Sequence, residues 1–188
     1  MVPMMREDDR EHWDLRHAAP TSVGPPGLPE VFAPFEDLFP TRGAALEVAC
    51  GRGTMAVWLA ERGMDVFAVD GSPIAIDLAR RLAVDSGVAD RCQFDVVDLD
   101  DGLPGGPRVD LLVCHMFRDG RLDRPMIDRL APRGMLAVAT LSEVGSRPGS
   151  YRARPGELRE AFEQLELIAQ GEGDGIAWFL GRRENDLR

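Results

Sequence analysis

The sequence predicts one doubly wound, Rossmann-like α/β domain built on a seven-stranded mixed sheet. From residue 44 onward, short apolar runs alternate with segments of helical period, which is the texture of repeated βα units. The runs are nearly continuous in Val, Leu, Ala and Ile, as expected of parallel strands covered on both faces. Two further apolar runs near the carboxyl end flank a glycine-rich turn, which predicts an antiparallel terminal hairpin.

Composition places the chain among ordinary globular proteins. Its 188 residues suit a single domain with one sizeable core, and 44% are hydrophobic while 29% are charged. All 22 basic residues are arginine, and 32 acidic residues bring the net charge to −10. Because such a surface repels phosphate backbones and anionic lipid, we expect neither a nucleic-acid nor a membrane partner.

Cysteine usage and the amino-terminal residues bear on location. Cys50, Cys92 and Cys114 show neither a disulfide-dense pattern nor a zinc-type spacing. The start of the chain is acidic where a secretory signal needs a basic patch and an apolar core, and no apolar run reaches about 18 residues. These features favour a reducing cytoplasm.

The first part of the chain divides into a lead-in and the opening βα units. Residues 1–27 begin charged and end in the breaker-rich PTSVGPPG, which indicates a lid-like or partly disordered lead-in to a domain over 28–188. A helix over 28–39 is expected to bend at Pro34. The next predicted elements are a strand over 44–49, a helix over 54–63, a strand over 64–70 and a helix over 72–87.

The second part continues the pattern and then closes with the hairpin. Pro155 and Glu157 occupy positions favoured at a helix start. The predicted elements are strands over 91–97, 109–115 and 134–142, helices near 122–131 and over 154–165, and hairpin strands over 165–170 and 176–181.

The loop after the first strand is the predicted ligand site. In open parallel sheets, ligands bind beyond the carboxyl ends of the strands, where the strand order reverses. Gly51 and Gly53 allow the backbone to turn sharply and to approach a ligand without a Cβ in the way. Asp70 ends the second strand 19 residues after Gly51, close to the offset at which an acid reaches ribose hydroxyls. Loop and acid are therefore predicted to face one nucleoside.

Glu47 favours a cationic nucleoside. It lies four residues before Gly51 in an otherwise apolar strand, where its charge would repel a pyrophosphate. S-adenosylmethionine, which bears a sulfonium and an ammonium, suits such a carboxylate better than a nicotinamide dinucleotide does. Ala56 stands at the third position of the GxGxxG fingerprint, which tolerates Ala, so that position does not discriminate between the two cofactors.

Five segments together resemble the ordered motifs of class I S-adenosylmethionine-dependent methyltransferases: EVACGRG, VFAVDGSP, FDVVDLDD, VDLLVCHMF and LAPRGMLAVAT, within residues 44–142. The resemblance implies a seven-stranded sheet whose last strand is antiparallel, in agreement with the predicted hairpin. One departure is Ala49, where the family more often has Gly. By position the resemblance implies cofactor contacts from Glu47, Ala49, Cys50, Gly51, Gly53, Asp70, Gly71, Ser72, Asp98, Leu99 and Cys114.

A narrower resemblance points to small-molecule methyltransferases of the tellurite-resistance type. WDLR near the start, the ACGRG loop, the DGSP turn and the late YRARPGELREAF are similar to that group. This implies a small-molecule acceptor and leaves transfer to O, N, S or a chalcogen oxyanion open.

Five residues are candidates for the acceptor side. Methyl transfer is an in-line displacement that depends mainly on positioning. If the acceptor must lose a proton, His115 at the end of a central strand is the candidate base, although a purely structural histidine is an alternative. Arg118 either binds an anionic acceptor or lies solvated. Trp13 and Arg16 form a lid or pack on the domain, and Tyr151 follows the fifth strand towards the same edge.

Two rival functions fit parts of the same sequence. A nicotinamide-dependent oxidoreductase gives no reason for Glu47 or for the terminal hairpin. A cofactor-binding domain without catalytic activity fits the same motifs. Asp98, Asp100 and Asp101 suit adenine-side contacts and solvated charge better than a metal, so no metal is expected.

Overall fold

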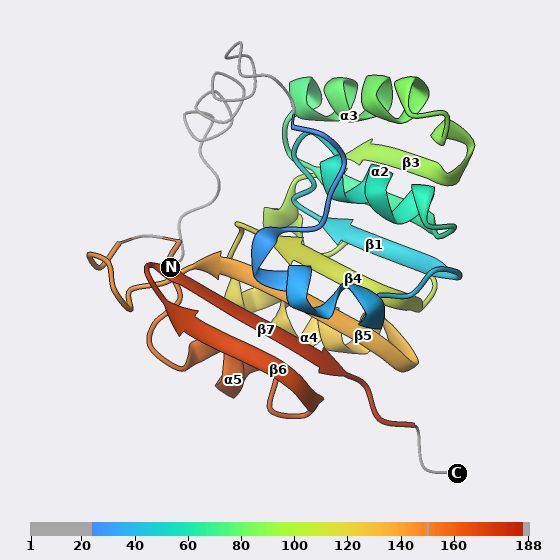
Figure 1. Cartoon of the computed structure of the whole chain (residues 1–188). Coiled ribbons are helices and arrows are strands. Elements are labelled where there is room, and N and C mark those ends of the chain that lie inside the picture. Colours follow the sequence, from blue (N-terminus) through green and yellow to red (C-terminus); the bar gives the residue numbers. More distant parts are fainter. Residues whose placement is uncertain (1–23, 150, 186–188) are drawn as a thin grey trace.

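A seven-stranded sheet in the order β3-β2-β1-β4-β5-β7-β6 organises the computed structural model, which describes residues 24–149 and 151–185 (Figure 1). β1 to β5 are parallel, and β7 runs antiparallel to both β5 and β6. The predicted fold class is confirmed. The strands are β1 Ala44–Val48, β2 Asp65–Asp70, β3 Cys92–Val96, β4 Val109–His115, β5 Leu130–Leu141, β6 Glu166–Gly173 and β7 Ile176–Arg182.

Helices cover both faces of the sheet. On one face lie α2 (Thr54–Glu61), α3 (Pro73–Asp85) and the 3₁₀ helix η1 (Glu30–Leu38); on the other lie α4 (Asp123–Arg129) and α5 (Glu157–Ala161). Short 3₁₀ turns complete the connections: η2 Ala89–Arg91, η3 Leu99–Asp101 and η4 Gly120–Leu122. Within the described ranges, no helix is long and apolar enough to cross a membrane.

Side-chain alternation along the strands divides the core into two clusters. In β4, Leu111 and Val113 join the cluster under η1, α2 and α3, whereas Leu112 and Cys114 join the cluster under α4 and α5. This period of two fixes which strand-end side chains share a face. His115 therefore lies on the face of Val113, and Glu47, which pairs with Val113, lies on that face too.

Most element boundaries differ from the expectations by a few residues, and three differences in extent or helix type stand out. The segment before β1 forms a 3₁₀ helix throughout, because Pro34 has no N–H for an α-helical bond. β5 begins at Leu130 rather than 134, with an irregularity in its pairing to β4. α5 ends at Ala161 rather than 165, since Phe162 has left the helical region at φ −114°.

The reversal of strand order lies between β1 and β4. β1 pairs with β2 on one side and with β4 on the other, so the chain after β1 and the chain after β4 emerge next to each other. The crevice outside these carboxyl ends is where open α/β sheets bind ligands. The glycine loop and His115 thus belong to one edge of the sheet.

Candidate functional site

The loop between β1 and α2 is anchored by Asp70. Its Oδ2 accepts a hydrogen bond from the Gly51 N–H at 2.8 Å, and its Oδ1 accepts one from the Ser72 N–H at 2.9 Å. Each carboxylate oxygen can accept more than one hydrogen bond, so Asp70 retains acceptor capacity for a ligand's hydroxyls. The acid at the end of β2 therefore fixes the loop and stays available to a ligand.

Left-handed backbone conformations shape this loop. Gly51 and Gly53 have φ of +52° and +76°, and Ala49 has φ +56° although it bears a Cβ. A Cβ on Gly53 would lie 2.6 Å from the Ala79 Cβ, so the close approach of the loop to α3 requires glycine there. A non-glycine residue in this region costs on the order of 1–3 kcal/mol. Such strain is typical of functional loops.

Glu47 is a buried carboxyl group beneath the loop. It is only 4% exposed, and the Ala56 backbone N–H is its hydrogen-bond donor. Among the described residues, no atom hydrogen-bonds to Oε2. Burial, opposed by the Ala56 hydrogen bond and reinforced by the charge of Asp70, raises the pKa of Glu47 to about 8. A buried acid with an unsatisfied oxygen beside a strained loop indicates a site for a hydrogen-bond-donating, cationic ligand.

The segment after β3 is organised by Asp98. Its Oδ1 accepts from the Asp100 N–H at 3.0 Å and caps η3. The Leu99 side chain is buried in the core under α4 and α5, so only its backbone remains for ligand contact. Two partly exposed apolar residues, Ile74 and Val96, flank Asp70 along α3 and β3. The sequence analysis named neither residue, because their exposure becomes visible only in the folded chain.

The two last residues of β4 point to opposite faces. The Cys114 thiol is buried in the core of the α4 side, where burial raises its pKa to about 12, and it lies 3.6 Å from the Phe117 carbonyl oxygen. The expectation that Cys114 contacts the cofactor therefore does not hold for its thiol, which points into the core. Burial lowers the pKa of His115, which keeps its imidazole neutral at neutral pH. The histidine, rather than the cysteine, shares the face of Glu47.

Arg118 is held inside the protein. Its side chain is 7% exposed and forms a bidentate pair with Asp123, at 2.5 and 2.9 Å, and a 2.8 Å bond to Glu157. The expectation that Arg118 binds an anionic acceptor, or lies solvated, does not fit this arrangement. Nearby, Arg121 pairs with Asp119 and Asp100. The guanidinium groups of the loop after β4 thus tie that loop to its neighbours.

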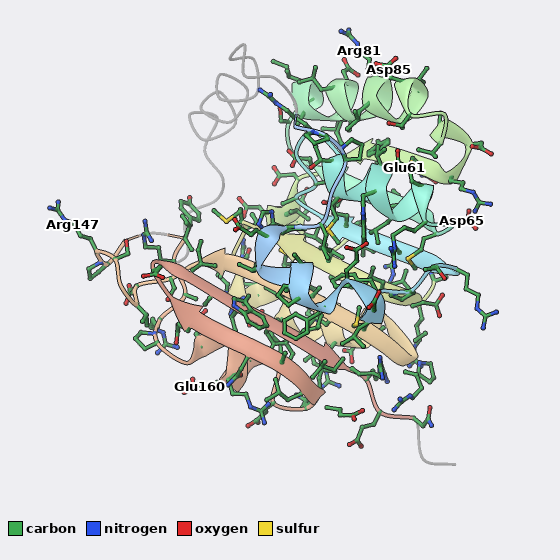
Figure 2. The ribbon with its side chains drawn as sticks, viewed as in Figure 1. Glu61, Asp65, Arg81, Asp85, Arg147 and Glu160 are labelled. Atoms are coloured by element: carbon green, nitrogen blue, oxygen red, sulfur yellow. The ribbon has the colours of Figure 1, made fainter. Side chains whose placement is uncertain are left out.

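Of the remaining acceptor candidates, Tyr151 lies within the described residues, whereas Trp13 and Arg16 do not. Tyr151 is exposed at φ +63° in the loop after β5, and Met116, directly after His115, is also exposed. Trp13 and Arg16, with the lead-in up to residue 23, lie outside the described residues. Figure 2 shows Arg147, in the same loop as Tyr151, extending away from the domain. In the described part of the chain, no cluster of three His, Cys, Asp or Glu is arranged for a metal.

An open depression of about 620 Å³ lies at the other edge of the sheet, where β1 and β4 begin. Exposed side chains such as Asp37, Arg42 and Arg133 line it. It is far along the strands from the glycine loop, so the buried acid and the strained loop define the candidate site instead.

Comparisons with known proteins find relatives of this chain in sequence and in fold. A family model described as a methyltransferase domain matches residues 45–134. A 2-heptyl-1-hydroxyquinolin-4(1H)-one methyltransferase of Mycobacteroides abscessus is 30% identical over 174 residues, covering 82% of this chain and 75% of the relative. Among solved structures, TehB from Haemophilus influenzae superposes with a TM-score of 0.74 at 14% identity, covering 93% of this chain and 67% of that one. The DhpI complex with SAH superposes with a TM-score of 0.65 at 22% identity, covering 95% and 96%.

Proposed function

This chain belongs to the class I S-adenosylmethionine-dependent small-molecule methyltransferases, and from that premise we propose that it methylates a hydroxyl group on a neutral aromatic or heterocyclic acceptor. The observation that supports the cofactor site most strongly is the pair of acids, Glu47 and Asp70, around the strained glycine loop. When bound, S-adenosylmethionine supplies an electrophilic methyl group on a sulfonium. An anionic dinucleotide has no comparable reason to bind above a buried carboxyl group.

The positions of these groups support the following cofactor contacts. Asp70 accepts from the ribose hydroxyls, with the backbone of Gly71 and Ser72 alongside. The backbone of Ala49, Cys50, Gly51 and Gly53 lines the methionine and ribose part, and Glu47 faces the ammonium. Asp98 and the backbone of Leu99 hold the adenine edge, while Ile74 and Val96 offer apolar surface to its ring. The exposure of these two side chains supports this last assignment.

The arginines near this edge favour a neutral acceptor over an oxyanion, because groups of the same chain already engage them. Arg118 and Arg121 are neutralised by carboxylates of the same chain, and Arg152 donates to the Ser142 carbonyl oxygen at 2.9 Å. Met116 and Tyr151, 43% and 62% exposed, offer apolar surface at the same edge. The curated relative acts on a hydroxyquinolone, which has the hydroxyl and the apolar body that this edge suits.

His115 accepts the proton of the acceptor hydroxyl as the new bond forms. The imidazole lies at the end of β4 on the face of Glu47, and its lowered pKa leaves it neutral and ready to accept a proton at pH 7. Positioning of the acceptor in line with the methyl group contributes the larger part of the rate. We place the reaction in the cytoplasm, a reducing compartment that suits the free cysteines Cys50, Cys92 and Cys114.

Titration calorimetry with S-adenosylhomocysteine tests the cofactor assignment. Asp70→Ala should weaken binding by about 10- to 150-fold, because a charge-assisted hydrogen bond of about 1.5–3 kcal/mol is lost. Asp77→Ala, which removes an exposed acid from α3, is the matched control and should bind as the native chain does. Unchanged affinity in Asp70→Ala, or tight NADH binding without S-adenosylhomocysteine binding, would contradict the assignment. To test the acceptor class, the rate of methylation of 2-heptyl-1-hydroxyquinolin-4(1H)-one is compared with that of selenite, a chalcogen oxyanion. We expect methylation of the hydroxyquinolone.

A further inference from the structure

We propose that Glu47 is a neutral carboxylic acid in the empty site and gives up its proton when the cationic methionine end of the cofactor enters. This rests on the proposed cofactor site and adds a step to it: donor binding and proton release are one event. Glu47 then acts as a specificity residue, since a ligand without a cation beneath the loop cannot compensate its ionisation.

The geometry leaves Glu47 with one unsatisfied oxygen. β1 is an interior strand between β2 and β4, and Glu47 lies one residue before its end, paired with Val113. Its neighbours on that face of the sheet belong to the apolar core under α2 and α3. The Ala56 N–H from α2 satisfies one side of the carboxyl group, while Oε2 has no partner among the described residues. An ionised carboxylate in this position is under-solvated.

The groups around Glu47 do not compensate a negative charge. From β2, Asp70 adds a like charge that raises the pKa of Glu47 further, after burial itself. Three thiols interact with it from other elements: Cys50 in the loop, Cys92 in β3 and Cys114 in β4, each with a pKa raised first of all by burial. His115, on the same face, is held neutral by its lowered pKa. The empty site therefore favours the protonated acid.

An arriving ammonium or sulfonium reverses this balance. An opposite charge within about 4–6 Å favours the ionised form of a carboxyl group. With a pKa of about 8 in the empty protein, roughly nine-tenths of Glu47 is protonated at pH 7. Glu47 should thus release about 0.9 proton on binding at pH 7, and its ionisation alone should raise the affinity about ninefold from pH 6 to pH 7. The ligand's own amino group, with an ordinary pKa near 7.7–8.0, stays mostly protonated over that interval.

Calorimetry in two buffers of different ionisation enthalpy measures this proton directly. S-adenosylhomocysteine is titrated into the native chain at pH 7 in phosphate and in Tris, and the difference in heat gives the number of protons released. We expect a net release of about 0.8 proton with S-adenosylhomocysteine, because the ligand's own amino group takes up between about 0.1 and 0.2 proton on binding. With 5′-methylthioadenosine, which lacks the ammonium, we expect fewer than about 0.2. S-adenosylmethionine, with both cations, should release as many protons as S-adenosylhomocysteine or more.

The variant Glu47→Gln distinguishes the protons released by residue 47 from those exchanged by the ligand's own amino group. The variant should bind S-adenosylhomocysteine with no measurable proton release and lose the ninefold change in affinity. Asp77→Asn, an exposed acid of α3, is the control and should release protons as the native chain does. Release of less than 0.5 proton by the native chain, despite normal binding, would overturn the inference and leave the cofactor site intact. Absence of S-adenosylhomocysteine binding would overturn both. The native-chain measurement decides even if Glu47→Gln fails to fold.

Discussion

Removal of the Arg118 guanidinium tests whether the loop after β4 is held by a buried ion cluster. Arg118 joins three parts of the fold: its own loop, the start of α4 through Asp123 and the start of α5 through Glu157. Arg118→Met keeps most of the side-chain volume and deletes the charge. The variant leaves two carboxylates facing a site from which their common partner has been removed.

The expected loss of unfolding free energy in Arg118→Met follows from the exposure of the arginine and its two carboxylate partners. Arg118 is 7% exposed and its two carboxylate partners are each 18% exposed, so the pair energies are screened only in part. Breaking a buried pair typically costs about 3–5 kcal/mol, and the partial exposure of the carboxylates places the expectation near 3 kcal/mol. For a chain of this size, that loss lowers the melting temperature by about 6–12 °C.

The pH dependence of the loss has a defined sign. Although burial acts to raise the pKa of Glu157, hydrogen bonds from the Arg154 N–H and Arg118, with the charges of both arginines, hold it below its ordinary value. A depressed carboxyl pKa contributes stability above the unfolded-state pKa, and this contribution disappears as the pH falls through the folded-state pKa. The difference between native chain and Arg118→Met should therefore shrink as the pH falls below about 4.5.

Urea unfolding at pH 7 and pH 4, followed by circular dichroism, measures both quantities. Arg124→Met is the matched control, because Arg124 also extends from the α4 region but pairs with Asp128 at the surface and should cost less than about 1 kcal/mol. A loss in Arg118→Met no larger than that of the control would refute the buried-cluster interpretation. So would a loss that grows at acid pH.

Two further substitutions probe the edge of the sheet and its core. His115→Gln should lower kcat on a hydroxyl acceptor and abolish the acid limb of the pH–rate profile. The affinity for S-adenosylhomocysteine should stay within about twofold of that of the native chain. An unchanged acid limb would show that His115 does not transfer the proton. Thr140→Val should raise the free energy of unfolding by about 1 kcal/mol, because the Thr140 hydroxyl is fully buried and unpartnered among the described residues. A lower free energy of unfolding, measured with urea, would show that the hydroxyl has a partner.

The parts of the site that the sequence predicted are those that local rules determine. Gly51, Gly53 and Asp70 are recognisable because a tight turn and a strand-end acid need those residue types at that spacing. The orientation of Cys114 also follows from a local rule, since side chains alternate along a strand, but the resemblance by position counted it among the cofactor contacts.

Other features depend on contacts between distant residues. Arg118 is engaged by Glu157, which lies 39 residues further along the chain, and nothing in its neighbourhood in the sequence indicates that partner. The unsatisfied oxygen of Glu47 likewise depends on how α2 packs over β1, since Ala56 supplies the N–H. Spacing predicts which residues meet a ligand, whereas burial and pairing become visible only in the folded chain.

A crystal structure of the chain with S-adenosylhomocysteine bound would test the central claim most directly. The account predicts the ribose hydroxyls within hydrogen-bond distance of Asp70 and the amino-acid end of the ligand directed at Glu47 Oε2. A nucleoside bound at another edge of the sheet, or one whose amino group avoids Glu47, would contradict it.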